Sequence, residues 1–156
     1  MTKALYVVAA AMIAISAAAQ ADWKTSEKVD EFDGTKTVFH KKTGTQGSYF
    51  FIRESQGSTD LFFGGRDSHI CGDERGQVAL LYKFDNSEIY YTRASLSTNR
   101  SSLFLNLGKE ESRKWLYPTP EHPDLTMNEF IAKAKGSQTM TIRYHDSCGT
   151  QFTYKF

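Results

Sequence analysis

Two cysteines and the histidines near them are the residues best placed to do chemistry. His145 and Asp146 closely precede Cys148, and His69 lies two residues before Cys71. A cysteine beside a histidine can act as a nucleophile, and two cysteines with two histidines can hold a tetrahedral zinc ion. The chain has no CxxC or HxxxH spacing, and a hydrolase would need a thiolate that stays unoxidised. A disulfide between Cys71 and Cys148 is therefore favoured, and the hydrolase and the zinc site are the alternatives.

The other polar residues form no pattern typical of catalysis. His40 and His122 have no neighbours that would give them a catalytic role. Adjacent carboxylates in a strand or helix do not face a common point, as an acid–base pair requires. The adjacent pairs are Asp30–Glu31, Asp73–Glu74 and Glu110–Glu111. We therefore predict no catalytic residue, no cofactor and no metal.

The N-terminus has the three-part pattern of a secretory signal peptide. Lys3 precedes an uncharged, alanine-rich run from Ala4 to Ala19, which closes in Ala19-Gln20-Ala21. Small residues three before and one before the cut suit signal peptidase, which places cleavage between Ala21 and Asp22. A membrane anchor is the alternative, but a span needs about twenty predominantly apolar residues. We expect residues 1–21 to be removed and the protein to be periplasmic or secreted, with no membrane-spanning part after cleavage.

Residues 22–156 have the length of one domain and balanced charge. The chain carries 19 basic residues, Lys3 among them, and 18 acidic residues, with both signs interspersed. Proteins that bind nucleic acid or anionic lipid generally carry a net positive face. We therefore predict one β-rich domain over residues 22–156 and no nucleic-acid partner.

Short segments rich in β-branched and aromatic residues, bounded by turn residues, predict an antiparallel β-sandwich-like fold with one or two short helices. Val78, Leu80, Tyr82 and Phe84 alternate with outward residues and predict a hairpin with the strand that follows. A second hairpin is expected across the turn at residues 146–149, which would place the disulfide at its tip. The expected strands are 36–41, 48–54, 59–63, 78–85, 88–96, 101–106, 138–145 and 151–156.

Two segments favour helix and one favours an extended connection. Thr126–Lys135 begins with a capping box formed by Thr126 and Glu129 and ends at Gly136. Lys109–Leu116 is a second, shorter candidate. Three prolines in the segment Tyr117–Pro123 force an extended or turn-like backbone, which we interpret as a surface connection.

Aromatic doublets mark three of the expected strands, at Phe50-Phe51, Phe62-Phe63 and Tyr90-Tyr91. Neighbours in a strand point to opposite faces, so either both faces are covered or one exposes aromatic rings. Most of these rings are expected to fill the core, and an exposed set would mark a partner surface.

The order of short motifs resembles a family of small exported proteins associated with type VI secretion loci, the VasI-like or TagO-like proteins. The matching pieces are Trp23, Asp33–Val38, Ser58–Leu61, Tyr82–Asp85, Leu103–Leu105 and Asp146–Gly149. The chain departs from the family near Arg53 and Glu54, where the family commonly has the partner cysteine that is here Cys71. The resemblance implies a β-sandwich-like domain with a non-enzymatic accessory or binding role in the cell envelope.

These observations favour an exported, non-enzymatic protein that presents a β-sandwich surface to a protein partner in the envelope. The candidate partner-binding residues lie in the proline-rich segment and are Tyr117, Pro118, Pro120, His122 and Pro123. One alternative is an inhibitor of a foreign envelope-active enzyme such as a lysozyme, because a rigid β domain can insert a loop into a cleft. The other is the Cys–His envelope hydrolase, with Cys148 as nucleophile and His145 as base.

Overall fold

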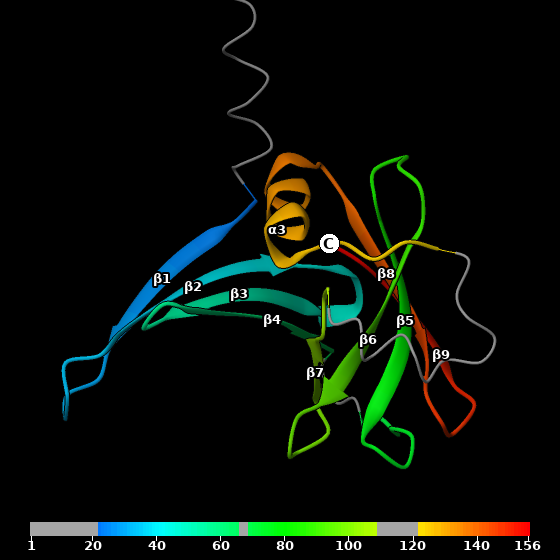
Figure 1. The fold of residues 1–156 in the computed structure, drawn as a ribbon, viewed down its shortest axis with the longest axis horizontal. Helices are drawn as coiled ribbons and strands as arrows, with labels where there is room; N and C mark the ends of the chain where they lie inside the picture. Colours follow the sequence, from blue (N-terminus) through cyan, green and yellow to red (C-terminus); the bar gives the residue numbers. More distant parts are fainter. Residues whose placement is uncertain (1–21, 66–68, 109–121) are drawn as a thin grey trace, which may run out of the picture.

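Nine strands form one antiparallel sheet in the computed structural model, which describes residues 22–65, 69–108 and 122–156 (Figure 1). The order across the sheet is β1-β2-β3-β4-β7-β6-β5-β8-β9. The described part also contains the helix α3 (Met127–Gly136) and the 3-10 turn η1 (Thr45–Gly47). The strands are β1 (Lys24–Val29), β2 (Lys36–Thr43), β3 (Tyr49–Ser55), β4 (Ser58–Gly64), β5 (Gln77–Phe84), β6 (Tyr90–Leu96), β7 (Ser102–Leu105), β8 (Met140–His145) and β9 (Gln151–Lys155).

Both predicted hairpins are confirmed. In the first, β5 pairs with β6 so that Tyr82 lies opposite Tyr90. In the second, β8 pairs with β9 so that Ile142 lies opposite Tyr154, and Cys148 lies in the turn between them. The alternation in β5 sets its two faces, because residues at even positions from Val78 to Phe84 are buried and those between them are not.

The sheet curls so that its two halves pack against each other around one core. Phe50 on β3 contacts Phe156, just after β9, with ring centroids 5.8 Å apart. Phe63 on β4 contacts Tyr144 on β8 at 5.9 Å. The predicted class, mainly antiparallel β with short helix, is confirmed, and the two facing layers belong to one continuous sheet.

Helix α3 covers the opening between the two halves of the sheet (Figure 1). Its capping box is the predicted one, since the Glu129 amide donates to Thr126 Oγ1 and the Thr126 amide donates to the Glu129 carboxylate. Its Phe130 ring contacts Phe50 at 5.7 Å and Phe84 at 5.2 Å. One buried side chain of the helix therefore joins strands from both halves.

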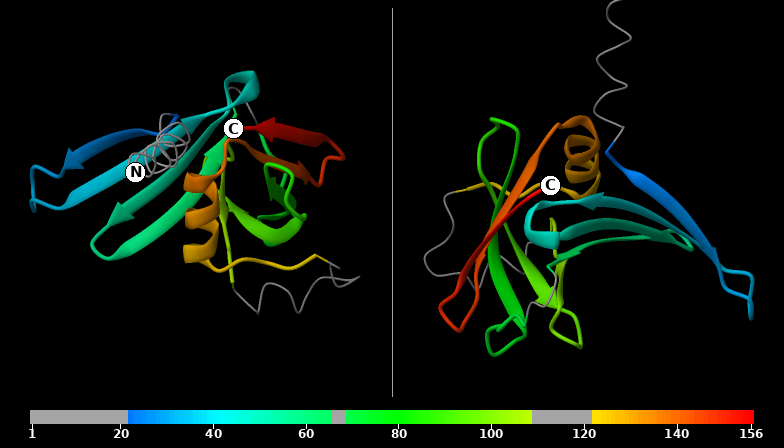
Figure 2. Two further views of the ribbon diagram at one scale, coloured as in Figure 1. Left: turned by 90° about the horizontal axis from the view of Figure 1, so that it is seen from above. Right: turned by 180° about the vertical axis from the view of Figure 1, so that it is seen from behind.

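The first strand was absent from the sequence prediction. All six residues of β1 are exposed, and it pairs only with β2 at the end of the sheet. Figure 2 shows β1 and the neighbouring ends of β2 to β4 projecting from the rest of the protein, and we call this part the arm. A strand that is exposed on both faces needs no apolar residues, so KTSEKV gives no hydrophobic period to detect.

Two sequence predictions concern segments that lie wholly outside the described residues, and the proline-rich segment Tyr117–Pro123 lies partly outside them. The two that lie wholly outside are the leader, residues 1–21, and the candidate helix Lys109–Leu116. No helix within the described ranges is both long and apolar enough to cross a membrane.

The disulfide joins the turn between β8 and β9 to the segment that precedes β5. Cys71 and Cys148 are bonded across a sequence separation of 77 residues. Hydrogen bonds reinforce the junction, because the Ser147 amide donates to the Cys71 carbonyl at 2.9 Å and Ser147 Oγ donates to the Gly72 carbonyl at 2.6 Å. The covalent bond and these contacts hold the same two segments together.

Replacing Cys71 and Cys148 together by serine should lower the free energy of unfolding by about 2–4 kcal/mol, because the crosslink restricts the unfolded chain over a long loop. Urea unfolding of the oxidised protein and of the double variant measures the change. Thiol titration of the denatured, unreduced protein should find no free thiol. Equal unfolding midpoints, or two free thiols, would contradict the structural role of this bond.

Candidate partner-binding surfaces

Both cysteines that the sequence offered as a nucleophile or as zinc ligands are joined in the disulfide. Neither Cys71 nor Cys148 has a free thiol. Within the described ranges, the one group of three ligand-type side chains close enough for a metal is Cys71, Asp146 and Cys148, and two of its three ligand atoms are the bonded sulfurs. While the disulfide is intact, this group offers a hydrolase no nucleophile and a zinc ion no thiolate.

The proline-rich candidate segment is described only at its C-terminal end. Tyr117, Pro118 and Pro120 lie outside the described residues. His122 is half-buried and Pro123 is exposed. The Pro123 carbonyl accepts a 2.9 Å hydrogen bond from the Tyr91 amide, which fixes this end of the segment to β6.

A half-buried carboxylate, Asp124, follows the proline-rich segment directly and joins it to Gly108, the last described residue before position 109. Its oxygens accept hydrogen bonds from Tyr82 Oη and Thr92 Oγ1, both at 3.1 Å. They also accept from the amides of Gly108 at 3.1 Å and Leu125 at 2.8 Å. Burial raises the pKa of the Asp124 carboxyl above its usual value, although these hydrogen bonds favour the ionised form. Residues 108 and 124 are thus held at one point of the fold.

The aromatic doublets put one ring in the core and the other on the outer face. Phe50, Phe63 and Tyr90 are buried, and the partners Phe51 and Phe62 are half-buried. The Phe51 and Phe62 rings stack at 5.1 Å. The Arg53 guanidinium lies over the Phe62 ring, with its Cζ atom 5.7 Å from the ring centroid. The outer-face rings of Phe51 and Phe62 are therefore partly covered by each other and by Arg53.

Among the residues that the structure describes, the most exposed aromatic residue is Phe32, in the turn that joins β1 to β2. We call residues 30–35 the tip turn. The Phe32 side chain is 100% exposed, whereas Val29, which precedes the turn, is 54% exposed. The tip turn lies at the far end of the arm (Figure 2). The fold therefore holds one phenylalanine ring out in water, away from every core side chain.

Local hydrogen bonds fix the tip turn. The Asp30 amide donates to the Thr35 carbonyl at 2.8 Å, and the Gly34 amide donates to the Asp30 carbonyl at 2.9 Å. The Phe32 amide donates to Asp30 Oδ1 at 2.8 Å, and the Thr35 amide donates to Asp33 Oδ1 at 2.8 Å. Gly34 has a φ of +74°, a conformation that favours glycine. The backbone that carries Phe32 is thus defined rather than loose.

Three carboxylates surround Phe32 in sequence. They belong to Asp30, Glu31 and Asp33, all exposed. Hydrogen bonds from Thr35 hold the pKa of Asp33 below its usual value, so this group stays ionised near neutral pH. The tip turn presents an apolar ring within a negative charge cluster.

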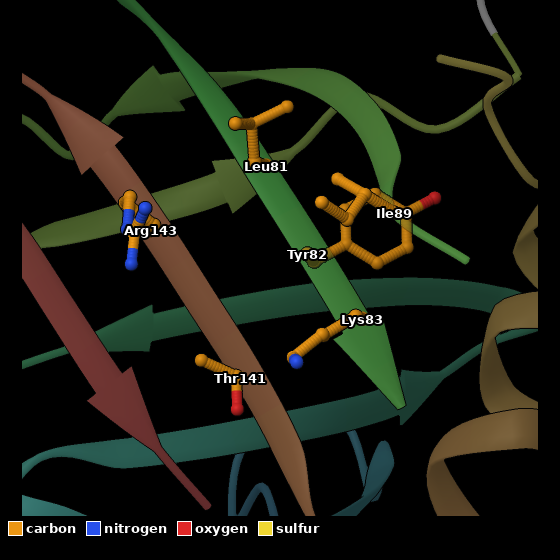
Figure 3. Close-up of a pocket in the computed structure, with 6 residues that line it drawn as sticks. All are labelled: Leu81, Tyr82, Lys83, Ile89, Thr141 and Arg143. Atoms are coloured by element: carbon orange, nitrogen blue, oxygen red, sulfur yellow. The ribbon is translucent and has the colours of Figure 1, made fainter. Parts of the chain in front are cut away.

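A groove on the outer face of β5 and β8 has the opposite charge (Figure 3). Leu81 and Ile89 supply apolar surface, and Ile89 is 41% exposed. Lys83 and Arg143 lie along the same groove, since Leu81 is in register with Arg143 and Lys83 is in register with Thr141. We call this the basic groove; it is lined by Leu81, Tyr82, Lys83, Ile89, Thr141 and Arg143.

Neither the tip turn nor the basic groove was predicted from the sequence. The available signal for the first was a single phenylalanine among acidic residues directly before Asp33-Gly34, a turn dipeptide. The basic groove gave no signal in the sequence, because its cations Lys83 and Arg143 lie on strands about sixty residues apart in the chain. Their proximity depends on the pairing of β5 with β8.

Comparison with protein-family models, with curated proteins and with solved structures finds no match to this chain.

Asp124→Asn should change how stability depends on pH. The folded protein holds the Asp124 proton more tightly than the unfolded chain does, so the wild type loses stability as the pH rises from the ordinary value of 3.8 through the raised pKa. The variant lacks this contribution. Urea unfolding across that pH range should show the wild type losing stability relative to the variant. Parallel pH profiles, or a wild type that gains on the variant, would contradict the raised pKa.

Proposed function

We propose that this protein is an exported, non-enzymatic binding module that engages a protein partner in the cell envelope through the tip turn. The observation that carries the proposal is the complete exposure of Phe32 on a hydrogen-bonded turn. Leaving an aromatic side chain in water forgoes the free energy that its burial would provide. Burial against a partner recovers that free energy.

The geometry of the tip turn suits recognition of another protein. Binding interfaces depend on a few anchor residues, and aromatic side chains in well-packed pockets are among the most effective. The tip-turn hydrogen bonds reduce the conformational entropy that binding would otherwise cost. Gln56 Nε2 donates to Thr35 Oγ1 at 2.7 Å, which ties the tip turn to the hairpin of β3 and β4 and limits its movement.

The expected leader and the disulfide support the extracytoplasmic setting of this proposal. A signal-peptide pattern directs a chain across a membrane, and disulfides persist in oxidising compartments. The resemblance to type VI secretion-associated envelope proteins agrees with an accessory binding role. A cleft-inserting inhibitor of an enzyme such as a lysozyme is a special case, in which the partner is the enzyme and the tip turn is the inserted segment.

Phe32→Ala should weaken partner binding about thirtyfold or more, because truncation of an aromatic anchor typically costs about 2 kcal/mol or more. The mature domain is immobilised, its partner is captured from an envelope extract, and the affinity of the purified pair is measured for each variant. Purified lysozymes are measured in parallel.

Val29→Ala is the matched control, because Val29 is exposed on the same hairpin but outside the tip turn. It should retain the wild-type affinity. A partner that binds Phe32→Ala as tightly as the wild type would overturn the proposal. Absence of binding to every lysozyme would remove only the inhibitor version.

A further inference from the structure

We propose that the partner of the tip turn is a second copy of this chain, whose basic groove accepts Phe32. This inference rests on the proposed role of Phe32 as a docking anchor. Each copy carries an acidic tip with one apolar ring and a basic groove with an apolar lining. The two surfaces are complementary in charge and in polarity, and both are present on every molecule.

The basic groove has the character required of the receiving surface. Ile89 and Leu81 would contact the phenyl ring, since both contribute apolar surface to the groove. Lys83 and Arg143 would lie beside the carboxylates of the tip turn. Neither of these cations has an ion-pair partner among the residues that the structure describes.

The positive charge extends beyond the groove. The sequences of β5, β8 and β9 contain no aspartate or glutamate. Lys155 on β9 is in register with Thr141, on the same face as Lys83. The whole outer face of these three strands thus carries cations without a carboxylate, in a protein whose total charge is almost balanced.

The carboxylates nearest the groove in sequence are already engaged. Asp85 accepts hydrogen bonds from the amides of Thr139 at 2.8 Å and Gln138 at 3.3 Å. Glu88 accepts from Tyr90 Oη at 2.9 Å. Within the described residues, neither Asp85 nor Glu88 forms an ion pair with Lys83 or Arg143, which leaves these two cations able to pair with an anionic group from outside the chain.

The tip turn of one molecule cannot reach the basic groove of the same molecule. The tip turn lies at the end of the arm, and the groove lies on β5 and β8 on the opposite side of the molecule (Figure 1, Figure 2). A contact between the tip of one copy and the groove of another uses two different patches, so it is head-to-tail. Such contacts build open chains, or rings when the rotation closes. A contact as small as a single hairpin tip is expected to be weak.

The test is a complementation experiment in sedimentation equilibrium on the mature, oxidised protein. Phe32→Ser removes the anchor and keeps the groove, whereas Lys83→Glu with Arg143→Glu reverses the groove charge and keeps the anchor. Neither exchange touches a buried side chain, and circular dichroism verifies that both variants are folded. Lys24→Glu with Arg100→Glu is the matched control, because it changes the net charge equally at exposed sites outside both surfaces.

The wild type and the control should show an apparent mass that rises with concentration towards the millimolar range. Each defective variant alone should remain a monomer. An equimolar mixture of the two should form a one-to-one dimer and nothing larger, because one competent tip and one competent groove remain. A wild type that is monomeric throughout, or a mixture that does not dimerise, would overturn the proposal.

These outcomes are separable from the fate of the proposed function. If the wild type is monomeric but a captured envelope protein still depends on Phe32, the anchor role stands and the second-copy partner is wrong. If neither self-association nor envelope binding depends on Phe32, both proposals fail.

Discussion

The structure depends on the need to cover one apolar face of a single sheet. Strands β3 to β9 each carry an apolar set on the same side, and α3 is too short to cover it alone. The sheet solves this by curling, so that the rings of Phe50 and Phe63 pack on Phe156 at 5.8 and 6.4 Å. The disulfide holds the hairpin of β8 and β9 to the segment before β5, which secures one side of the curl. Burial of these rings is the main source of stability.

The arm is a consequence of that curl. At the β1 end, the sheet extends beyond the region where the opposite half lies, so β1 has no facing layer and all of its residues are exposed. Exposure of β1 costs little free energy, because its residues are mostly polar. Phe32 differs, since its apolar ring is fully exposed to water. In the docking that we propose, the hydrogen-bonded turn would hold Phe32 as a rigid anchor, and the basic groove would supply a surface of complementary character.

Sequence reasoning predicted the elements whose signals are local. The alternation from Val78 to Phe84, the Thr126 and Glu129 capping box and the Asp146–Gly149 turn each depend on neighbouring residues, and each is present as expected. The Cys71–Cys148 pairing followed from there being only two cysteines. The strand β1 gave no signal, because exposure on both faces removes the periodicity. The basic groove could not be predicted either, since Lys83 and Arg143 become neighbours only through the pairing of β5 with β8.

The most direct measurement is photo-crosslinking from position 32. Replacing Phe32 by p-benzoyl-phenylalanine keeps an aromatic side chain at the tip and makes it reactive under near-ultraviolet light. After irradiation of the purified, concentrated protein, mass spectrometry should find crosslinks between two copies, from position 32 to residues 81–89 or 141–143. Irradiation that gives no bond between copies from position 32, or bonds only to surfaces away from the basic groove, would contradict the proposed docking of Phe32.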